Sequence, residues 1–175
     1  MNLKNFLKKL FKGDPNFEPN IFYSQEGEDL ILNRLFKNKN NGFYVDVGAH
    51  HPVRFSNTFY FYKKGWNGIN IDAMPGSMKY FNKYRPRDIN IEMGVGIEKN
   101  KSSFYQFNEP ALNTFDPKEA SLKQKHSYKL EKKVYLYQDK LENILDNNLP
   151  KNQKIDFLTI DVEGKDKEVL LSNNW

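Results

Sequence analysis

The sequence predicts an α/β fold with a largely parallel sheet, and two observations point to it. Short apolar runs rich in β-branched and aromatic residues recur along the chain, and helical patterns separate them. The connections are long enough for crossover helices, which join parallel strands in a right-handed sense. With 175 residues and 38% apolar content, the chain can bury one core, which argues against wholesale disorder.

The first twelve residues predict a basic amphipathic helix. Apolar side chains recur there at helical spacing, and lysines without any acid take other positions. Gly13 to Pro15 end this helix, and a loop follows to about Asn20. The helix either docks on its own domain or a partner, or it contacts an anionic membrane surface. We therefore divide the chain into this segment, residues 1–20, and a domain of residues 21–175.

The next stretch predicts a helix, a strand and a second helix. Ser24 is expected to cap the first helix, because polar residues suited to a first turn follow it. The strand covers residues 43–47, a short apolar run that stops at Gly48. The second helix covers residues 56–64.

Further strands and helices alternate after Gly65. A strand over residues 68–72 precedes a helix that carries Met78 and Phe81. A strand over residues 89–96 follows, and we expect residues 102–107 to pair with it.

The last part of the chain contains one more buried strand. Residues 108–133 are polar and show no clear period, whereas a short helix around Ile144 ends at Pro150. Residues 155–162 form an apolar strand, and a helix starts at Lys165. Since a sheet of this kind normally continues with three further strands, we expect this strand to be a long, exposed edge that could pair with a partner.

Composition excludes several classes of protein. The chain has no cysteine, so a disulfide scaffold, a thiolate zinc site and a cysteine nucleophile are excluded, and three histidines leave little scope for an all-histidine metal centre. No apolar run approaches the roughly 18 residues that cross a bilayer. The net charge is +5, but only four basic residues are arginines, so we expect no nucleic-acid partner. These features favour a cytoplasmic protein, with the N-terminal helix able to contact the inner face of the membrane.

Acidic residues lie at or near the ends of three of the predicted strands. Asp46 lies in the first, Asp72 closes the second, and Asp161 with Glu163 follows the last. In an open α/β sheet, ligands bind at the carboxyl ends of the strands, so these acids predict one nucleotide-like site there. Each acid could instead bind loop amides or cap the next helix.

The loop after Gly48 narrows the choice of ligand. A dinucleotide fold has G-x-G-x-x-G there, whereas this chain continues Ala49-His50-His51-Pro52-Val53. A diphosphate needs those glycines for close approach, but a sulfonium nucleoside carries no diphosphate. The loop therefore favours S-adenosylmethionine over NAD.

Four motifs together resemble the FkbM-type methyltransferase family. They are YSQEGEDLIL, YVDVGAHHP followed by SNT, GWNGINIDAMP, and FLTIDVEGKDKEVL. The resemblance covers nearly all of the chain after residue 22. It implies a Rossmann-like methyltransferase sheet, apparently cut short after its fourth main strand and the following helix.

The resemblance also implies an activity and a set of site residues. The enzyme would use S-adenosylmethionine to methylate a hydroxyl of a sugar, a glycan or a secondary metabolite. The cofactor-binding residues would be Asp46, Gly48, Ala49, Asp72 and Ala73, with Asp72 on the ribose. Asp161 and Glu163 would face the reacting groups.

A hydroxyl acceptor requires a base. A histidine has a suitable unperturbed pKa, and either His50 or His51 could serve. Asp161 and Glu163 could instead hold a divalent metal, although we assign no metal site. The alternative function is a non-catalytic α/β module that binds anionic membrane, glycan or a partner chain through the N-terminal helix and the lysine-rich stretch up to Lys133.

Overall fold

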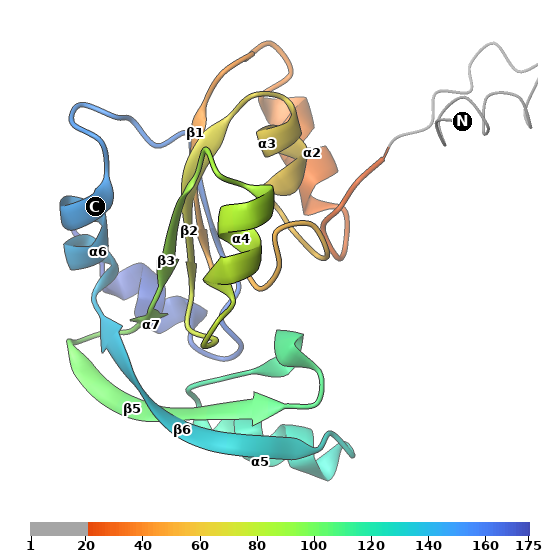
Figure 1. Cartoon of the computed structure of the whole chain (residues 1–175), viewed down its shortest axis with the longest axis vertical. Coiled ribbons are helices and arrows are strands. Elements are labelled where there is room, and N and C mark those ends of the chain that lie inside the picture. Colours follow the sequence, from red (N-terminus) through yellow and green to blue (C-terminus); the bar gives the residue numbers. More distant parts are fainter. Residues whose placement is uncertain (1–20) are drawn as a thin grey trace, which may run out of the picture.

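The computed structural model describes residues 21–175, and a four-stranded parallel sheet lies at its centre (Figure 1). Its strands, in the order β3-β2-β1-β7, are β1 (Phe43–Val47), β2 (Asn67–Asp72), β3 (Ile89–Glu92) and β7 (Phe157–Ile160). The predicted parallel α/β sheet is confirmed. Since β2 and β7 lie on opposite sides of β1, the strand order reverses at β1, and a crevice is expected at the carboxyl ends of β1 and β7.

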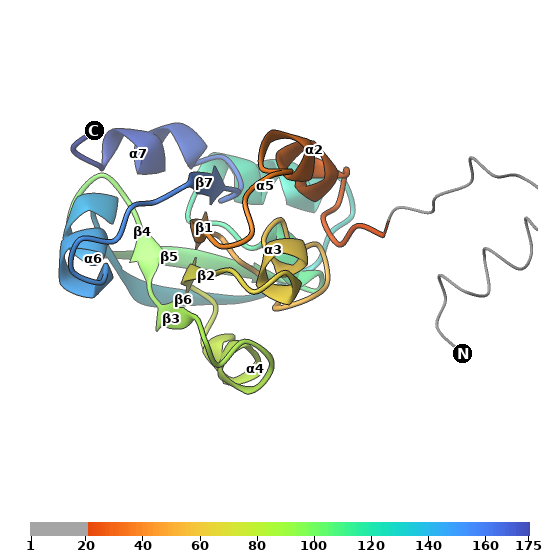
Figure 2. The same ribbon diagram turned by 90° about the horizontal axis from the view of Figure 1, so that it is seen from above.

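Helices cover both faces of this sheet (Figure 2). One face carries α2 (Glu28–Leu35) and α3 (Phe59–Lys63), and the other carries α6 (Leu141–Asn148) and α7 (Asp166–Leu171). Between β2 and β3 the chain forms α4 (Met78–Tyr84), which packs beside β3.

Alternation along β1 divides the core into two layers. Val45 and Val47 belong to an aliphatic cluster with Ile144 of α6 and Val169 of α7. Tyr44 points the other way and joins an aromatic cluster that includes Phe61 and Trp66. Successive side chains of a strand alternate between faces, so Asp46 lies on the same side as Tyr44, toward α3.

A second, smaller sheet lies across the carboxyl ends of the main strands (Figure 1). It has the order β4-β6-β5, with β4 (Gly94–Val95), β5 (Asn100–Phe107) and β6 (Leu130–Asp139). Between β5 and β6 the chain forms the 3-10 helix η1 (Pro110–Leu112) and α5 (Pro117–Lys125).

Two expectations about this region were wrong or incomplete. The predicted strand of residues 89–96 divides into β3 and β4, which belong to different sheets. Residues 102–107 do not pair with it, because β5 pairs antiparallel with β6, with Ser103 opposite Tyr135. The partner strand lies partly in the polar stretch of residues 108–133, which has no apolar alternation to reveal it.

The first helix also starts later than expected. Its N-cap is Gly27, at φ 88°. Ser24 is not the N-cap residue, but its side chain serves the first turn: its Oγ accepts from the N–H of Asp29 at 3.4 Å, and its hydroxyl donates to Oδ1 of Asp29 at 2.8 Å. The predicted helix of residues 56–64 shortens to α3, because the side chains of Ser56 and Thr58 serve a buried polar network instead.

The last strand lies at the edge of the sheet, as predicted, but it is shorter than residues 155–162. β7 pairs only with β1 among the described residues. The predicted N-terminal helix and loop, residues 1–20, lie outside the described part of the chain. Within residues 21–175, no helix combines the length and apolar character needed to cross a membrane.

Candidate active site

Two adjoining pockets lie between the main sheet and the smaller one. The first, called here the apolar pocket, holds about 680 Å³ including its open mouth. The second, called the polar pocket, holds about 840 Å³ on the same measure. Residues that line both are Gly48, His50, Ala111, Asp161 and Glu163.

The apolar pocket takes its walls from both sheets. Ile71, Ala73 and Met74 come from the end of β2 and its loop, whereas Phe104 and Phe115 come from the smaller sheet and the segment after η1. The rings of Phe104 and Phe115 contact each other, with their centroids 4.7 Å apart. This pocket can therefore enclose a flat apolar group.

Gly48 joins the two pockets at the end of β1. Its φ is 81°, and a Cβ at this position would lie 2.0 Å from the backbone oxygen of Asp161. Its N–H and that of Ala49 donate to the carbonyl of Ile71, at 2.9 and 3.1 Å. A glycine is needed here because the loops after β1 and β7 approach so closely.

Asp46 is buried at the back of the polar pocket, with only 4% of its surface exposed. Its Oδ2 accepts a hydrogen bond from the Thr58 hydroxyl at 2.6 Å. Burial raises the pKa of Asp46 to about 6, although the charge of Arg85 opposes that rise. Ala49 lines the same pocket and also packs against α4.

Asp72 closes β2 and lines the apolar pocket together with Ala73. Its Oδ1 accepts from the N–H of Met74 at 2.7 Å, and its Oδ2 accepts from the N–H of His50 at 2.8 Å. Burial raises its pKa, and the two backbone hydrogen bonds oppose the rise. Asp72 thus binds loop amides, yet each carboxylate oxygen keeps a second lone pair for a ligand.

The two histidines occupy different positions. His50 lines both pockets at φ 53°, and burial together with Arg54 lowers its pKa below the usual value. His51 lines neither pocket. Its Nδ1 accepts from the N–H groups of Val53 and Arg54, at 3.1 and 2.9 Å, so this ring shapes the loop.

The loop after β7 carries the remaining acids. Asp161 borders both pockets, and its pKa is raised, first by partial burial and then by the charge of Glu163. Glu163 sits at φ 41° and its Oε2 accepts from the ammonium group of Lys123 at 2.6 Å. Its backbone oxygen accepts from the Thr114 hydroxyl at 2.7 Å. Glu163 is therefore fixed to the smaller sheet's connection by two contacts.

Metal ligation has little support in this arrangement. Within residues 21–175, no group of three or more histidines or acids is arranged to hold a metal ion. The carboxylate of Glu163, one of the two candidate ligands from the sequence, is engaged by Lys123.

Several residues of the site were missed at the sequence level. Lys123, Ala111 and Thr114 belong to the polar stretch that showed no period, so no pattern drew attention to them. Thr58 belongs to the SNT motif of the family resemblance, which assigned it no role in the site. The acid side chains before and within α2, Glu26 and Glu28, also line the polar pocket.

Comparison with known proteins gives one match. Residues 46–175 match the sequence model of a family described as the methyltransferase FkbM domain. No curated protein and no solved structure matches significantly. The matched region contains both pockets apart from the contribution of residues 25–28.

Proposed function

Since the chain belongs to the FkbM methyltransferase domain family, we propose that it transfers a methyl group from S-adenosylmethionine to a hydroxyl group of a sugar, a glycan or another small metabolite. The observation that carries this proposal is the pair of pockets meeting at Gly48, His50 and Asp161, at the carboxyl ends of β1 and β7. One pocket suits a nucleoside and the other a charged or hydroxylated group, so donor and acceptor can meet where they join.

The apolar pocket fits the adenosyl part of this cofactor. Its side chains include Ile71, Met93 and Phe104, which can enclose a purine ring on both faces. Asp72 lies in the wall with a free lone pair on each oxygen, which suits the two hydroxyls of a ribose. The loop after Gly48 lacks the further glycines that a diphosphate needs for close approach, and the adenosyl sulfonium carries no diphosphate.

The polar pocket fits the amino-acid end of the cofactor and the acceptor. Asp46 is positioned to meet a cationic group, and Asn57 and Gln25 add amide groups suited to hydroxyls. When bound, S-adenosylmethionine supplies an electrophilic methyl group on a sulfonium. The chain's own contribution is alignment, because an in-line displacement depends on the angle and distance between donor and acceptor.

Two residues are candidates for taking the acceptor's proton. His50 lies where the pockets join, and its lowered pKa keeps the ring neutral at pH 7, as a base must be. Asp161 borders the same junction, and its raised pKa brings a carboxylate closer to neutral pH. His51 is the weaker candidate because two backbone N–H groups occupy its Nδ1, whereas Nε2 of His50 accepts from one exposed side chain, that of Arg54 at 3.3 Å.

The cofactor is tested first, by calorimetric titration of the protein with S-adenosylhomocysteine alongside a melting curve. Saturable binding should raise the free energy of unfolding by about 2.7 kcal/mol at a hundredfold excess over Kd. Asp72→Asn should weaken binding, and Asp146→Asn, an exposed change on α6, should not. Absence of heat and of a melting shift in the wild-type protein would refute the proposal.

The base is tested by single-turnover transfer to a panel of hydroxylated sugars at saturating cofactor. His50→Ala should slow transfer by about 10²-fold or more while leaving cofactor binding in place, the usual contribution of a general base. Asp161→Asn is measured in the same way, and His51→Ala serves as the matched histidine control. Equal rates in the His50 and His51 variants would exclude His50 as the base.

A further inference from the structure

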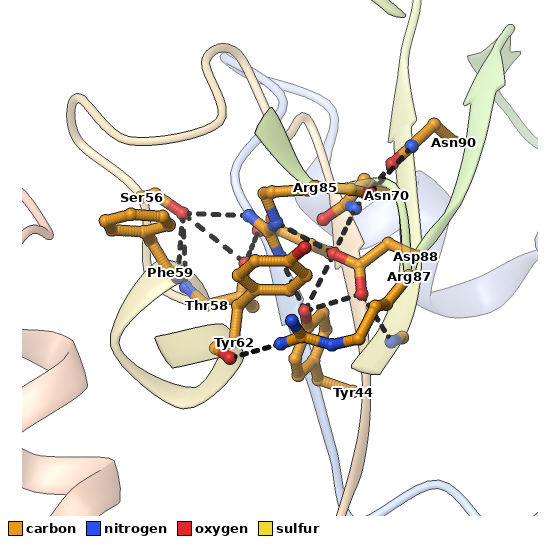
Figure 3. Close-up of polar contacts among 12 residues, drawn as sticks. Tyr44, Ser56, Thr58, Phe59, Tyr62, Asn70, Arg85, Arg87, Asp88 and Asn90 are labelled. Carbon is orange, nitrogen blue, oxygen red and sulfur yellow. Dashed lines mark hydrogen bonds and ion pairs between the residues drawn. The ribbon is translucent and has the colours of Figure 1, made fainter. Parts of the chain in front are cut away.

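A buried guanidinium lies behind β1, on the side of α3. Arg85 is 0% exposed, and its Nε donates to Oδ2 of Asp88 at 2.7 Å. One terminal nitrogen donates to the hydroxyl oxygens of Tyr44 at 2.8 Å and Thr58 at 2.9 Å, and the other reaches Ser56 at 3.3 Å (Figure 3). The function proposed above assigns no role to this network.

The network fixes the direction of the Thr58 hydroxyl. A hydroxyl has one proton to donate and two lone pairs to accept with. Arg85 donates into the Thr58 oxygen, and an arginine cannot accept, so the Thr58 proton points elsewhere. The acceptor it finds is Oδ2 of Asp46 at 2.6 Å, because the Ser56 hydroxyl oxygen lies farther away, at 3.4 Å. A short chain of hydrogen bonds therefore runs from the buried guanidinium to a carboxylate in the pocket wall.

Asp46 is held by one oxygen. Thr58 occupies Oδ2, and neither oxygen accepts any other hydrogen bond from the described residues. The residue also lines the polar pocket, which leaves Oδ1 available to a ligand there. Arg87 does not contribute to this, because its guanidinium donates to the carbonyl of Tyr62 at 2.6 Å (Figure 3).

We propose that Thr58, oriented by Arg85, is a positioning residue that fixes the carboxylate of Asp46 so that its second oxygen faces the cationic end of S-adenosylmethionine. This inference rests on the proposed function for the identity of the ligand, but the positioning itself is a property of the chain. The residues involved come from β1, the loop before α3 and the end of α4, so three separate segments define one oxygen position.

Electrostatics support the same role. Burial raises the pKa of Asp46, whereas Arg85 and the Thr58 hydrogen bond lower it and favour the charged form. Asp161 and Asp88 act in the opposite direction. Other titratable groups that line the same pocket are Glu26, Glu28, His50 and Glu163.

The test compares four variants by the pH dependence of S-adenosylmethionine binding. Thr58→Val removes the hydroxyl with little change of shape, Thr58→Ser keeps it, and Asp46→Asn cannot ionise. Tyr44→Phe is the control, because it removes a different hydroxyl from the same network. Losing one hydrogen bond to a charged acceptor should move the acidic midpoint of binding up by about one pH unit in Thr58→Val.

Thr58→Ser should have the wild-type binding midpoint. Tyr44→Phe should lower the melting temperature and leave the binding midpoint unchanged. Asp46→Asn should show no acidic step in binding at all. The proposal would be overturned if the acidic midpoint of binding in Thr58→Val equalled that of the wild type, or if Tyr44→Phe shifted it by as much as Thr58→Val. Thr58 would then have a structural role alone. Thr58→Ala is the second hydroxyl-free variant if Thr58→Val does not fold.

A second readout needs no ligand. The carboxyl carbon of Asp46 is followed by NMR during a pH titration of the free wild-type, Thr58→Ser and hydroxyl-free proteins. An upward shift in the hydroxyl-free protein alone supports the positioning role, and identical titrations refute it. If the wild-type protein binds no S-adenosylmethionine at any pH, the proposed cofactor fails, and this titration still decides the role of Thr58.

Discussion

Replacing Asp46 by Asn should make the protein more stable at neutral pH while weakening its site. The carboxyl is almost fully buried, and its pKa rises from 3.8 to about 6. At 1.36 kcal/mol per pH unit, ionising this group in the folded protein costs about 3 kcal/mol relative to ionising it in the unfolded chain. The side chain of Asn carries no charge and still offers an oxygen to the Thr58 hydroxyl.

The sign of the effect follows from the direction of the shift. A raised pKa means that the folded protein binds the proton more tightly than the unfolded chain, so stability falls as pH rises through the interval between the two values. The difference in unfolding free energy between Asp46→Asn and wild type should therefore be small near pH 4. It should grow through pH 6 and level off near 3 kcal/mol above pH 7, on the order expected from the shift.

Urea unfolding followed by circular dichroism, repeated at each pH from 4 to 8, measures this difference directly. Asp146→Asn is the matched control, since it makes the same chemical change at an exposed position of α6. The reasoning would be refuted if the difference in unfolding free energy between Asp46→Asn and wild type did not increase with pH. S-adenosylhomocysteine titration of the same variant at pH 7 should show weaker binding.

Three further changes test other parts of the site. Gly48→Ala should lower the free energy of unfolding by about 2 kcal/mol or more and abolish cofactor binding. The backbone there is left-handed, and the added methyl group would lie 2.0 Å from the carbonyl oxygen of Asp161. Urea unfolding measures the stability, and calorimetric titration measures the binding. Arg85→Met should destabilise the protein by about 3–5 kcal/mol in urea unfolding, since it leaves the buried carboxylate of Asp88 without its cation. A loss below about 1 kcal/mol would contradict a stabilising buried ion pair. Lys123→Met should lower the free energy of unfolding by about 1–2 kcal/mol, a smaller loss than for a fully buried ion pair because Glu163 is partly exposed. In the same assay, Lys123→Arg should retain part of the stability that Lys123→Met loses.

The centre of the parallel sheet was predictable from the sequence because β1 and β2 are buried on both faces. A strand between two helical layers must be largely apolar, so β1 stands out as an apolar run interrupted only by Asp46. The acids at the strand ends were predictable for the same reason, since a polar residue beside such a run requires a partner. Asp46, Asp72 and Asp161 indeed line the two pockets.

The smaller sheet was not predictable in the same way. β6 exposes Lys133, Tyr135 and Tyr137 on one face, and its other face is only half buried, so no apolar alternation marks it as a strand. It pairs with β5 through backbone hydrogen bonds, and cross-strand contacts such as that between Lys101 and Tyr137 lie on its exposed face. The network behind Asp46 was missed because it joins segments 12 to 41 residues apart in the sequence, and spacing alone does not reveal such contacts.

The division of the pocket between two sheets has a consequence for how new specificity could arise. The wall contributed by the smaller sheet comes from one continuous stretch of chain, from β4 to β6, whereas the opposite wall is assembled from the ends of β1, β2 and β7. Exchanging that single stretch for another sequence would remodel one side of the cavity and leave the parallel strands untouched. One connected stretch of chain can therefore change the shape of the apolar pocket while the strand ends that carry Asp72 and Asp161 stay in place.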